Sequence, residues 1–239
     1  MKLVVNIVAF ALVILMNTLA VTLPLNNQST GEISDRLDIM ITPAGYVFSI
    51  WSLIYLLLAI WIIRQFPKDR RDLPLYQETS GLFVLSCLLN STWILVWHYN
   101  YFLVSVFIML GLLCTLTALY KRIKSTGPSL LDLAPFSIYL GWISVATIVN
   151  ITYYLTDIDW NGFGISELLW AYMGLIVATL LTFWFRTRQH DLLYPLVFVW
   201  AFIGIGAKNM AEHSAYTYTA YALAVIILIF DLVYKRTRL

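Results

Sequence analysis

Long apolar stretches alternate with short polar ones along the whole chain of 239 residues. Eight of these stretches are each close to the roughly 20 residues that an α-helix needs to cross a bilayer. They occupy residues 3–24, 45–65, 79–98, 101–121, 133–155, 165–185, 192–208 and 215–234. The pattern predicts an all-α fold, a polytopic bundle of transmembrane helices. The last two stretches have little apolar length to spare, because Lys208, Glu212 and His213 fall between them.

The composition excludes a soluble protein. Hydrophobic residues make up 61% of the chain, charged residues only 12%, and the mean hydropathy is +0.80. Soluble domains, by contrast, carry about 25% charged residues. The Lys and Arg residues are scattered between the apolar stretches, which argues against a nucleic-acid partner. The partner that the composition does predict is the lipid bilayer.

The charges between the apolar stretches follow a regular alternation. If the N-terminus lies in the cytoplasm, eight spans put every Lys and Arg on the inner side except Arg36 and Lys208, in keeping with the positive-inside rule. The first stretch follows Lys2 but has no clear A-x-A cleavage site, so we interpret it as a retained helix rather than a signal peptide. We therefore expect an integral protein of a bacterial cell membrane with both termini in the cytoplasm.

The sequence shows no motif for catalysis: it contains no nucleophile elbow, P-loop or H-E-x-x-H helix. We interpret His98, His190 and His213, at the ends of apolar stretches, as solvated interfacial residues rather than metal or haem ligands. No cofactor is predicted. Ionisable residues avoid the middle of the stretches, which argues against ion-coupled transport. Asp231 lies near a stretch end, and we expect it to pair with Lys235 one turn further on.

Three apolar stretches each carry aromatic or amide side chains on one helical face. These side chains are Phe48, Trp51 and Tyr55 in the second stretch, Asn90, Trp93 and Trp97 in the third, and Tyr139, Trp142, Ala146, Asn150 and Tyr153 in the fifth. A buried Asn in lipid needs a polar partner, so these faces should point into the bundle. They either pack the helices together or line a flat apolar pocket with a few polar anchors. We interpret Asn6 and Asn17 in the first stretch as helix-packing residues.

Three blocks of the sequence, in this order, match the pattern of one known family. They are PAGYVFSIWSLIY (Pro43–Tyr55), LNSTW (Leu89–Trp93) and APFSIYLGWISVATIVN (Ala134–Asn150). In these blocks the chain resembles the TspO/MBR family, the tryptophan-rich sensory proteins that include the translocator protein. The resemblance covers about residues 1–156 and predicts a five-helix TspO-like transmembrane domain there. In 157–239 it leaves about three further transmembrane helices that short family members lack.

The resemblance implies a ligand pocket among the five helices, capped by the loop between the first two helices, here about Leu25 to Thr42. Family members bind porphyrins and other flat hydrophobic ligands. The positions implied to bind the ligand here are Tyr46, Phe48, Trp51, Tyr55, Asn90, Trp93, Trp142, Ala146, Asn150 and Tyr154. Tyr46 and Tyr154 stand where family members carry Trp, so each keeps an aromatic ring but loses the indole.

The sequence leaves three functions open. The first is a receptor or sensor that binds a flat hydrophobic ligand such as a porphyrin. The second is a membrane transporter of a small hydrophobic molecule, and the third is a light- or oxidant-dependent porphyrin-degrading enzyme. The lack of charge at mid-membrane and the tyrosine at Tyr154 favour the receptor, so no catalytic residue is assigned. The family's homodimer stays open, because the additional helices would cover a face that short members use for pairing.

Overall fold

The computed structural model describes residues 1–23 and 25–234. This described part is 82% helical and contains no β-strand, which confirms the all-α fold. Seven of its helical segments are long and apolar enough to cross a membrane: α1 (Lys2–Thr22), the 3₁₀ turn η2 (Gly45–Ser49) continued by α3 (Ile50–Ile63), α6 (Ser80–His98), α7 (Phe102–Lys124), α8 (Leu130–Asp157), α9 (Glu167–Gln189) and α11 (Ser214–Val233). Another apolar helix, α10 (Leu193–Asn209), is shorter. Each of the eight stretches predicted from the sequence is therefore helical.

The described chain forms two compact units. They comprise Met1–Leu37 with Trp51–Tyr154, and Asp38–Ile50 with the chain from Leu155 onward. The chain therefore passes between the units three times, and one of these passages falls at the start of α3. The two domains that the sequence predicts, 1–156 and 157–239, remain a prediction, because a compact unit is not by itself a domain that folds alone.

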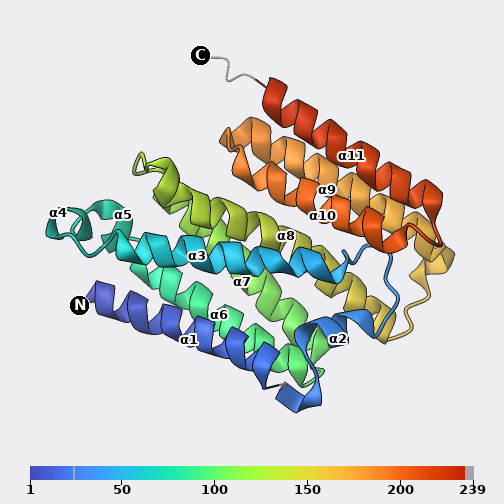
Figure 1. Cartoon of the computed structure of the whole chain (residues 1–239), viewed down its shortest axis with the longest axis horizontal. Coiled ribbons are helices and arrows are strands. Elements are labelled where there is room, and N and C mark those ends of the chain that lie inside the picture. Colours follow the sequence, from blue (N-terminus) through green and yellow to red (C-terminus); the bar gives the residue numbers. More distant parts are fainter. Residues whose placement is uncertain (24, 235–239) are drawn as a thin grey trace. The chain divides into compact units, whose positions relative to one another are not determined.

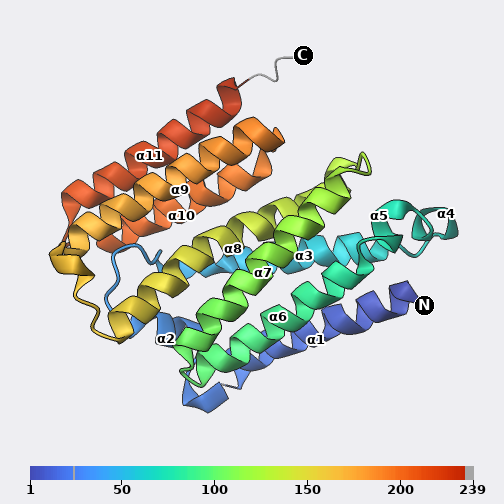
Figure 2. The same ribbon diagram turned by 180° about the vertical axis from the view of Figure 1, so that it is seen from behind.

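In the first unit α1 lies beside α6, and α6 lies beside α7 (Figures 1 and 2). Two short helices, α4 (Lys68–Arg71) and α5 (Pro74–Gln77), connect α3 to α6. Large rings from α3, α6 and α8 fill part of the core. The ring centroid of Trp61 lies 4.9 Å from that of Phe83 and 5.1 Å from that of Phe136, and all three side chains are fully buried. These rings join α3, α6 and α8 around one core.

A buried carboxylate ties the end of α3 to the start of α8. Asp132, whose side chain is 4% exposed, accepts hydrogen bonds from Arg64 Nε at 2.9 Å and Arg70 Nη2 at 3.0 Å. Tyr76 OH and Ser129 Oγ donate to the same carboxylate at 2.8 and 2.6 Å. The hydrogen bond with Asp132 raises the pKa of the Arg64 guanidinium, so this arginine stays charged. A single carboxylate thus holds the connection that contains α4 and α5 against the bundle.

The loop after α1 is fastened to the ends of other helices. Its short helix α2 (Thr30–Asp35) begins at a capping box, in which Ser29 Oγ accepts from the Glu32 amide and the Glu32 carboxylate accepts from the Ser29 amide. Tyr153 OH, near the end of α8, donates to the Ile33 carbonyl at 2.9 Å. The part of the predicted pocket cap that belongs to the first unit is therefore held in place by side-chain hydrogen bonds.

His98 requires a correction, because the interpretation of this residue as solvated was wrong. It is fully buried at the end of α6, where Nδ1 donates to the Ile94 carbonyl at 2.7 Å and Nε2 faces the Thr30 hydroxyl at 3.3 Å. The Asn26 side-chain amide, in the 3₁₀ turn η1 (Leu25–Asn27), donates to the His98 carbonyl at 3.0 Å. The histidine therefore fastens the loop to α6, a role that depends on partners far away in the sequence.

In the second unit α9, α10 and α11 lie side by side (Figures 1 and 2). A buried ion pair joins α9 to α11: Arg186 Nε lies 2.5 Å from Asp231 Oδ1, with side-chain exposures of 6% and 2%. Arg186 Nη2 also donates to the carbonyls of Asp231 and Tyr234, at 3.1 and 3.0 Å. Lys235, the expected partner of Asp231, lies outside the described residues, and the structure places Arg186 against this carboxylate.

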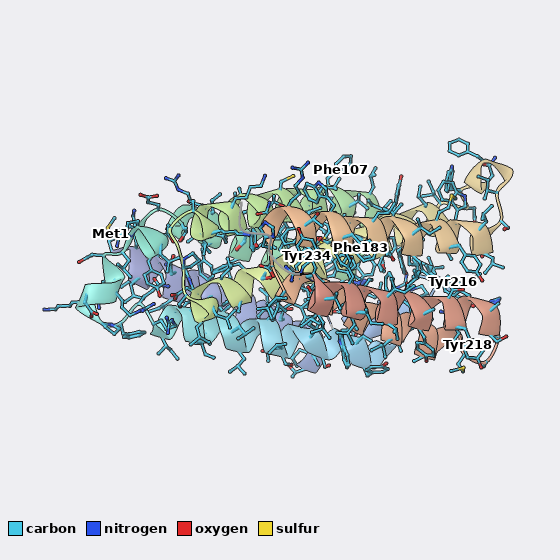
Figure 3. All side chains as sticks on the ribbon, turned by 90° about the horizontal axis from the view of Figure 1, so that it is seen from above. Met1, Phe107, Phe183, Tyr216, Tyr218 and Tyr234 are labelled. Carbon is cyan, nitrogen blue, oxygen red and sulfur yellow. The ribbon has the colours of Figure 1, made fainter. Side chains whose placement is uncertain are left out.

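Apolar side chains lie on the outside of the helices as well as in the cores. Phe107 of α7 and Tyr218 of α11 stand on the outer surface (Figure 3), and each is 65% exposed. Helices that are apolar on their outer as well as their inner faces are typical of segments surrounded by lipid.

Candidate functional site

Trp51 belongs to a cluster of four aromatic rings from α3 and α8. Its ring stacks on Tyr55, one turn further along α3, with centroids 5.5 Å apart and an angle of 19° between the planes. Tyr139 and Trp142 of α8 meet it edge-on, with centroid distances of 5.8 and 6.3 Å. Both α8 side chains are buried, whereas Trp51 and Tyr55 are half-buried. The two α3 rings therefore form the exposed edge of an otherwise buried cluster.

A chain of hydrogen bonds runs beside these rings. Asn17 Nδ2 of α1 donates to Asn90 Oδ1 at 3.1 Å, and Asn90 Nδ2 donates to Tyr139 OH at 2.8 Å. The Tyr55 hydroxyl is buried beside the side chains of both asparagines, which lie close to hydrogen-bonding range although neither meets strict hydrogen-bond geometry. A buried hydroxyl without a partner costs about 1–3 kcal/mol. The Tyr55 hydroxyl therefore belongs to the buried polar side of the cluster, whereas part of its ring lies at the exposed edge.

Trp93 and Asn150 lie in a second cluster, where α6, α7 and α8 meet. Trp93 Nε1 donates to Asn150 Oδ1 at 2.9 Å, and Asn150 Nδ2 donates to Ser105 Oγ at 2.9 Å. Trp93 also stacks on Trp97, with centroids 5.5 Å apart. Asn150 is 2% exposed, and both its oxygen and its nitrogen are used within the protein. Helix packing therefore accounts for this amide without a ligand.

The remaining predicted positions are spread over both units. Tyr46 and Phe48 belong to the second unit, where Tyr46 is 49% exposed and meets the Trp200 ring edge-on at 5.5 Å. Phe48, like Ala146 and Tyr154 on α8, is half-buried. Of the ten predicted ligand positions, the structure brings together Trp51, Tyr55, Asn90 and Trp142 in one cluster, and Trp93 and Asn150 in the other. Their role in ligand binding remains a prediction.

Asn17 and Tyr139 complete the central cluster but were not among the predicted ligand positions. Tyr139 shares a helical face with Trp142, so the spacing already indicated its direction. Asn17 was interpreted as a packing residue, and its hydrogen bond to Asn90 is consistent with that role. The signal that could have joined Asn17 to Asn90 is the presence of amides in two apolar helices, because each amide needs a partner within the protein. The sequence does not say which helix carries that partner.

The central cluster is suited to binding a flat apolar group. Trp51 and Tyr55 offer ring surface for stacking, and the amides of Asn17 and Asn90 lie behind them. Among the described residues, no group of three or more His, Cys, Asp or Glu side chains is placed to hold a metal ion. The chemistry that these residues provide is stacking, apolar contact and hydrogen bonding.

A comparison with protein families agrees with this architecture. A family model described as TSPO-like protein matches residues 3–233 of the chain. No curated protein and no solved structure matches the chain. The family match runs through α9, α10 and α11, beyond residues 1–156, to which the resemblance seen in the sequence extends. The chain therefore belongs to the TSPO-like family and is an integral membrane protein built as a helical bundle.

Proposed function

We propose that the protein is a membrane receptor that binds a flat hydrophobic ligand, such as a porphyrin, against Trp51. The observation that carries the proposal is the half-buried stack of Trp51 on Tyr55, at the edge of buried rings and with a buried hydroxyl that lacks a partner. Membership of the TSPO-like family supports a membrane protein of this general type.

A flat ring system gains free energy from two features of this edge. An aromatic pair contributes about 0.5–1.5 kcal/mol beyond the burial of apolar area, so stacking on Trp51 is favourable. An acceptor atom that receives the Tyr55 hydroxyl contributes about 0.5–1.5 kcal/mol and removes the penalty of the lone donor. A porphyrin carries both features, a wide apolar ring and carboxylate acceptors.

Quenching of tryptophan fluorescence by protoporphyrin tests the proposal on the purified protein in detergent. The parent protein should show saturable quenching, and Trp51→Ala should weaken the affinity about tenfold, which corresponds to about 1.4 kcal/mol. The matched control is Trp184→Phe, which removes an indole that is 54% exposed on α9 and should leave the affinity unchanged. Quenching that does not saturate, or an unchanged affinity in Trp51→Ala, would contradict the receptor.

The same preparation separates the receptor from the two other functions that the sequence leaves open. Loss of the porphyrin absorbance band under light, dependent on Trp51, would identify a porphyrin-degrading enzyme. Accumulation of the porphyrin in reconstituted vesicles, above the level in empty vesicles, would identify a transporter. A receptor leaves the pigment intact and accumulates none.

A further inference from the structure

The segment Asp38–Ile50, here called the strap, leads directly into α3 but belongs to the compact unit of α9, α10 and α11 (Figure 1). Its backbone is irregular up to η2. Ile39, Thr42 and Val47 of the strap are buried, with exposures of 4%, 0% and 0%. An irregular backbone leaves carbonyl and amide groups without helical partners, and in a membrane protein other parts of the chain must supply them.

The polar end of α10 supplies two of these partners. Lys208 Nζ donates to the Ile39 carbonyl at 3.1 Å, and Asn209 Nδ2 donates to the Met40 carbonyl at 2.9 Å. The Lys208 ammonium also lies 3.9 Å from the Asp38 carboxylate. In the sequence Lys208 only shortened an apolar stretch. In the structure it binds the strap.

Two further hydrogen bonds connect the strap to the preceding turns of α10. The Gly204 carbonyl accepts from the Ala44 amide at 3.1 Å, and Trp200 Nε1 donates to the Val47 carbonyl at 3.1 Å. Positions 200, 204 and 208 follow one another at intervals of four residues, so they share one face of α10. The strap is therefore bound along three successive turns of this helix.

Two glycines allow the strap to approach closely. A Cβ atom on Gly204 would overlap the Val47 side chain and would lie 3.2 Å from Pro43 Cβ. A Cβ atom on Gly174 of α9 would overlap the Ile41 side chain. Larger side chains at these two positions would push the strap away from the helices. The fit of the strap against α9 and α10 thus depends on the small size of Gly174 and Gly204 as well as on the hydrogen bonds.

The strap is continuous with the first turn of α3 and is hydrogen-bonded to it. The Val47 carbonyl, which accepts from Trp200, also accepts from the Ile50 amide. Ile50 is the first residue of α3, and Trp51 follows it. Val47 and Trp51 are thus four residues apart, joined by the last residues of η2 and the first residue of α3.

We propose that α10 positions the ligand site of this protein. Through the strap, Trp200, Lys208 and Asn209 hold the start of α3 so that Trp51 meets its ring cluster. These three are positioning residues and need no contact with the ligand. The inference deepens the proposed receptor function and rests on it only where a ligand is measured. Because coupling between two events is reciprocal, a ligand bound against Trp51 also stabilises the strap on α10.

Fluorine NMR of the full-length protein labelled with 5-fluorotryptophan reports on Trp51 without a ligand. The Trp51 resonance is identified by its loss in Trp51→Phe. Trp200→Phe, which keeps a ring but removes the donor to Val47, should shift or broaden that resonance, and Asn209→Ala should do the same. Trp184→Phe, on the exposed face of α9, should leave it in place.

Lys208 provides a gentler pair of variants, because its side chain is 21% exposed and its replacement is tolerated more easily by the fold. Lys208→Met removes the donor to the strap and should move the Trp51 resonance. Lys208→Arg keeps a donor at this position, so the Trp51 resonance of this variant should stay where it is in the parent protein. A Trp51 resonance that stays unmoved in both Trp200→Phe and Lys208→Met overturns the proposal.

Titration with protoporphyrin then connects the position of Trp51 to binding. Asn209→Ala and Lys208→Met should weaken the affinity by about fivefold, at the lower end of typical coupling between sites. Unchanged affinity in variants whose Trp51 resonance has moved would overturn the role of α10 in binding. If the parent protein binds no porphyrin while the Trp51 resonance still responds, the receptor function fails and the positioning of Trp51 by α10 stands.

Discussion

Helix α3 is held at its two ends by different kinds of interaction. At the end near Arg64, four side chains converge on the Asp132 carboxylate, two of them charged guanidinium groups. At the start, beside Ile50, the strap is held on α10 by an indole, an amide and an ammonium that donate to backbone carbonyls. We call the first arrangement the charged lock and the second the strap clamp.

The two arrangements respond differently to the loss of one partner. Removing the carboxylate from the charged lock leaves two guanidinium groups without their counter-charge, so the lock is lost as a whole. The strap clamp consists of separate hydrogen bonds, each contributing about 0.5–1.5 kcal/mol, so it weakens in steps. Trp51 therefore follows the end of α3 whose interactions can be lost one at a time. A site that responds to a ligand needs such a region of lower local stability.

The largest expected effect is the loss of the charged lock. Asp132→Ala should lower the free energy of unfolding by about 3 kcal/mol, the lower end of the range for breaking buried ion pairs, because Arg64 and Arg70 are partly exposed. Unfolding in mixed detergent micelles, followed by circular dichroism, measures the change. The control is Glu78→Ala, which removes the half-exposed pair with Arg122 and should cost at most about 1 kcal/mol. Equal losses in the two variants would contradict the special role of Asp132.

The next effect tests the strap clamp by volume rather than by charge. Gly204→Ala places a methyl group against Val47 and Pro43 and should destabilise the protein by about 1–3 kcal/mol. Gly111→Ala is the matched control on α7, because its Cβ atom would meet only Leu89, at 3.9 Å. That variant should be neutral or stabilising by up to about 1 kcal/mol, since Ala favours helix over Gly. The same unfolding assay compares the two, and a tolerated Gly204→Ala would mean that the strap is loosely packed.

The sequence predicted the helices well because each helix is encoded by its own residues. The length of the apolar stretches identified all eight, and the helical period placed Trp51 and Tyr55 on one face of α3, and Tyr139 and Trp142 on one face of α8. Both arguments need only the residues of one helix. The resemblance of three blocks likewise led to a family that the whole-chain match confirms.

The contacts between distant segments could not be predicted in the same way. Asp132 lies far along the chain from Arg64 and Arg70, and periodicity does not pair residues of different elements. Lys208 was interpreted as an interruption of an apolar stretch, because the irregular carbonyl that it binds gives no signal in the sequence. His98 was misjudged for the same reason, since its burial depends on a loop that folds back onto α6.

Two tyrosines near Trp51 provide a smaller and more local test at the adjustable end of α3. Tyr139→Phe removes the acceptor of the Asn90 amide and should cost about 1–2 kcal/mol, because a buried donor is left without a partner. Tyr55→Phe removes a hydroxyl that already lacks one, so stability should stay the same or rise. Porphyrin affinity, measured by quenching, should fall in Tyr55→Phe despite that stability. Loss of stability in Tyr55→Phe would show that the hydroxyl is bonded within the protein.

The smallest expected effect concerns pH and the loop that precedes the strap. Two hydrogen bonds with Ser29 lower the pKa of Glu32 below the ordinary value. The larger effect comes from the Ser29 backbone amide and the smaller from the Ser29 side chain. A carboxylate whose pKa is lower in the folded state stabilises that state above its unfolded pKa of about 4.3. This contribution is lost as the pH falls through the folded pKa. Hydrogen exchange of α2 amides, corrected for intrinsic rates, should therefore speed up slightly between pH 6 and pH values below about 4.

Glu32→Gln decides whether the capping box causes that change. Glutamine can still accept from the Ser29 amide but does not titrate, so exchange in α2 of this variant should be independent of pH over the same range. The strap offers the comparison within one molecule, because Trp200 and Asn209 bind it with groups that do not titrate in acid. Its amides near Val47 should exchange at rates that do not respond to this acidification. If α2 of Glu32→Gln still loosens in acid, another carboxylate controls the loop, and the contrast between the titrating loop and the hydrogen bonds of Trp200 and Asn209 to the strap would no longer rest on Glu32.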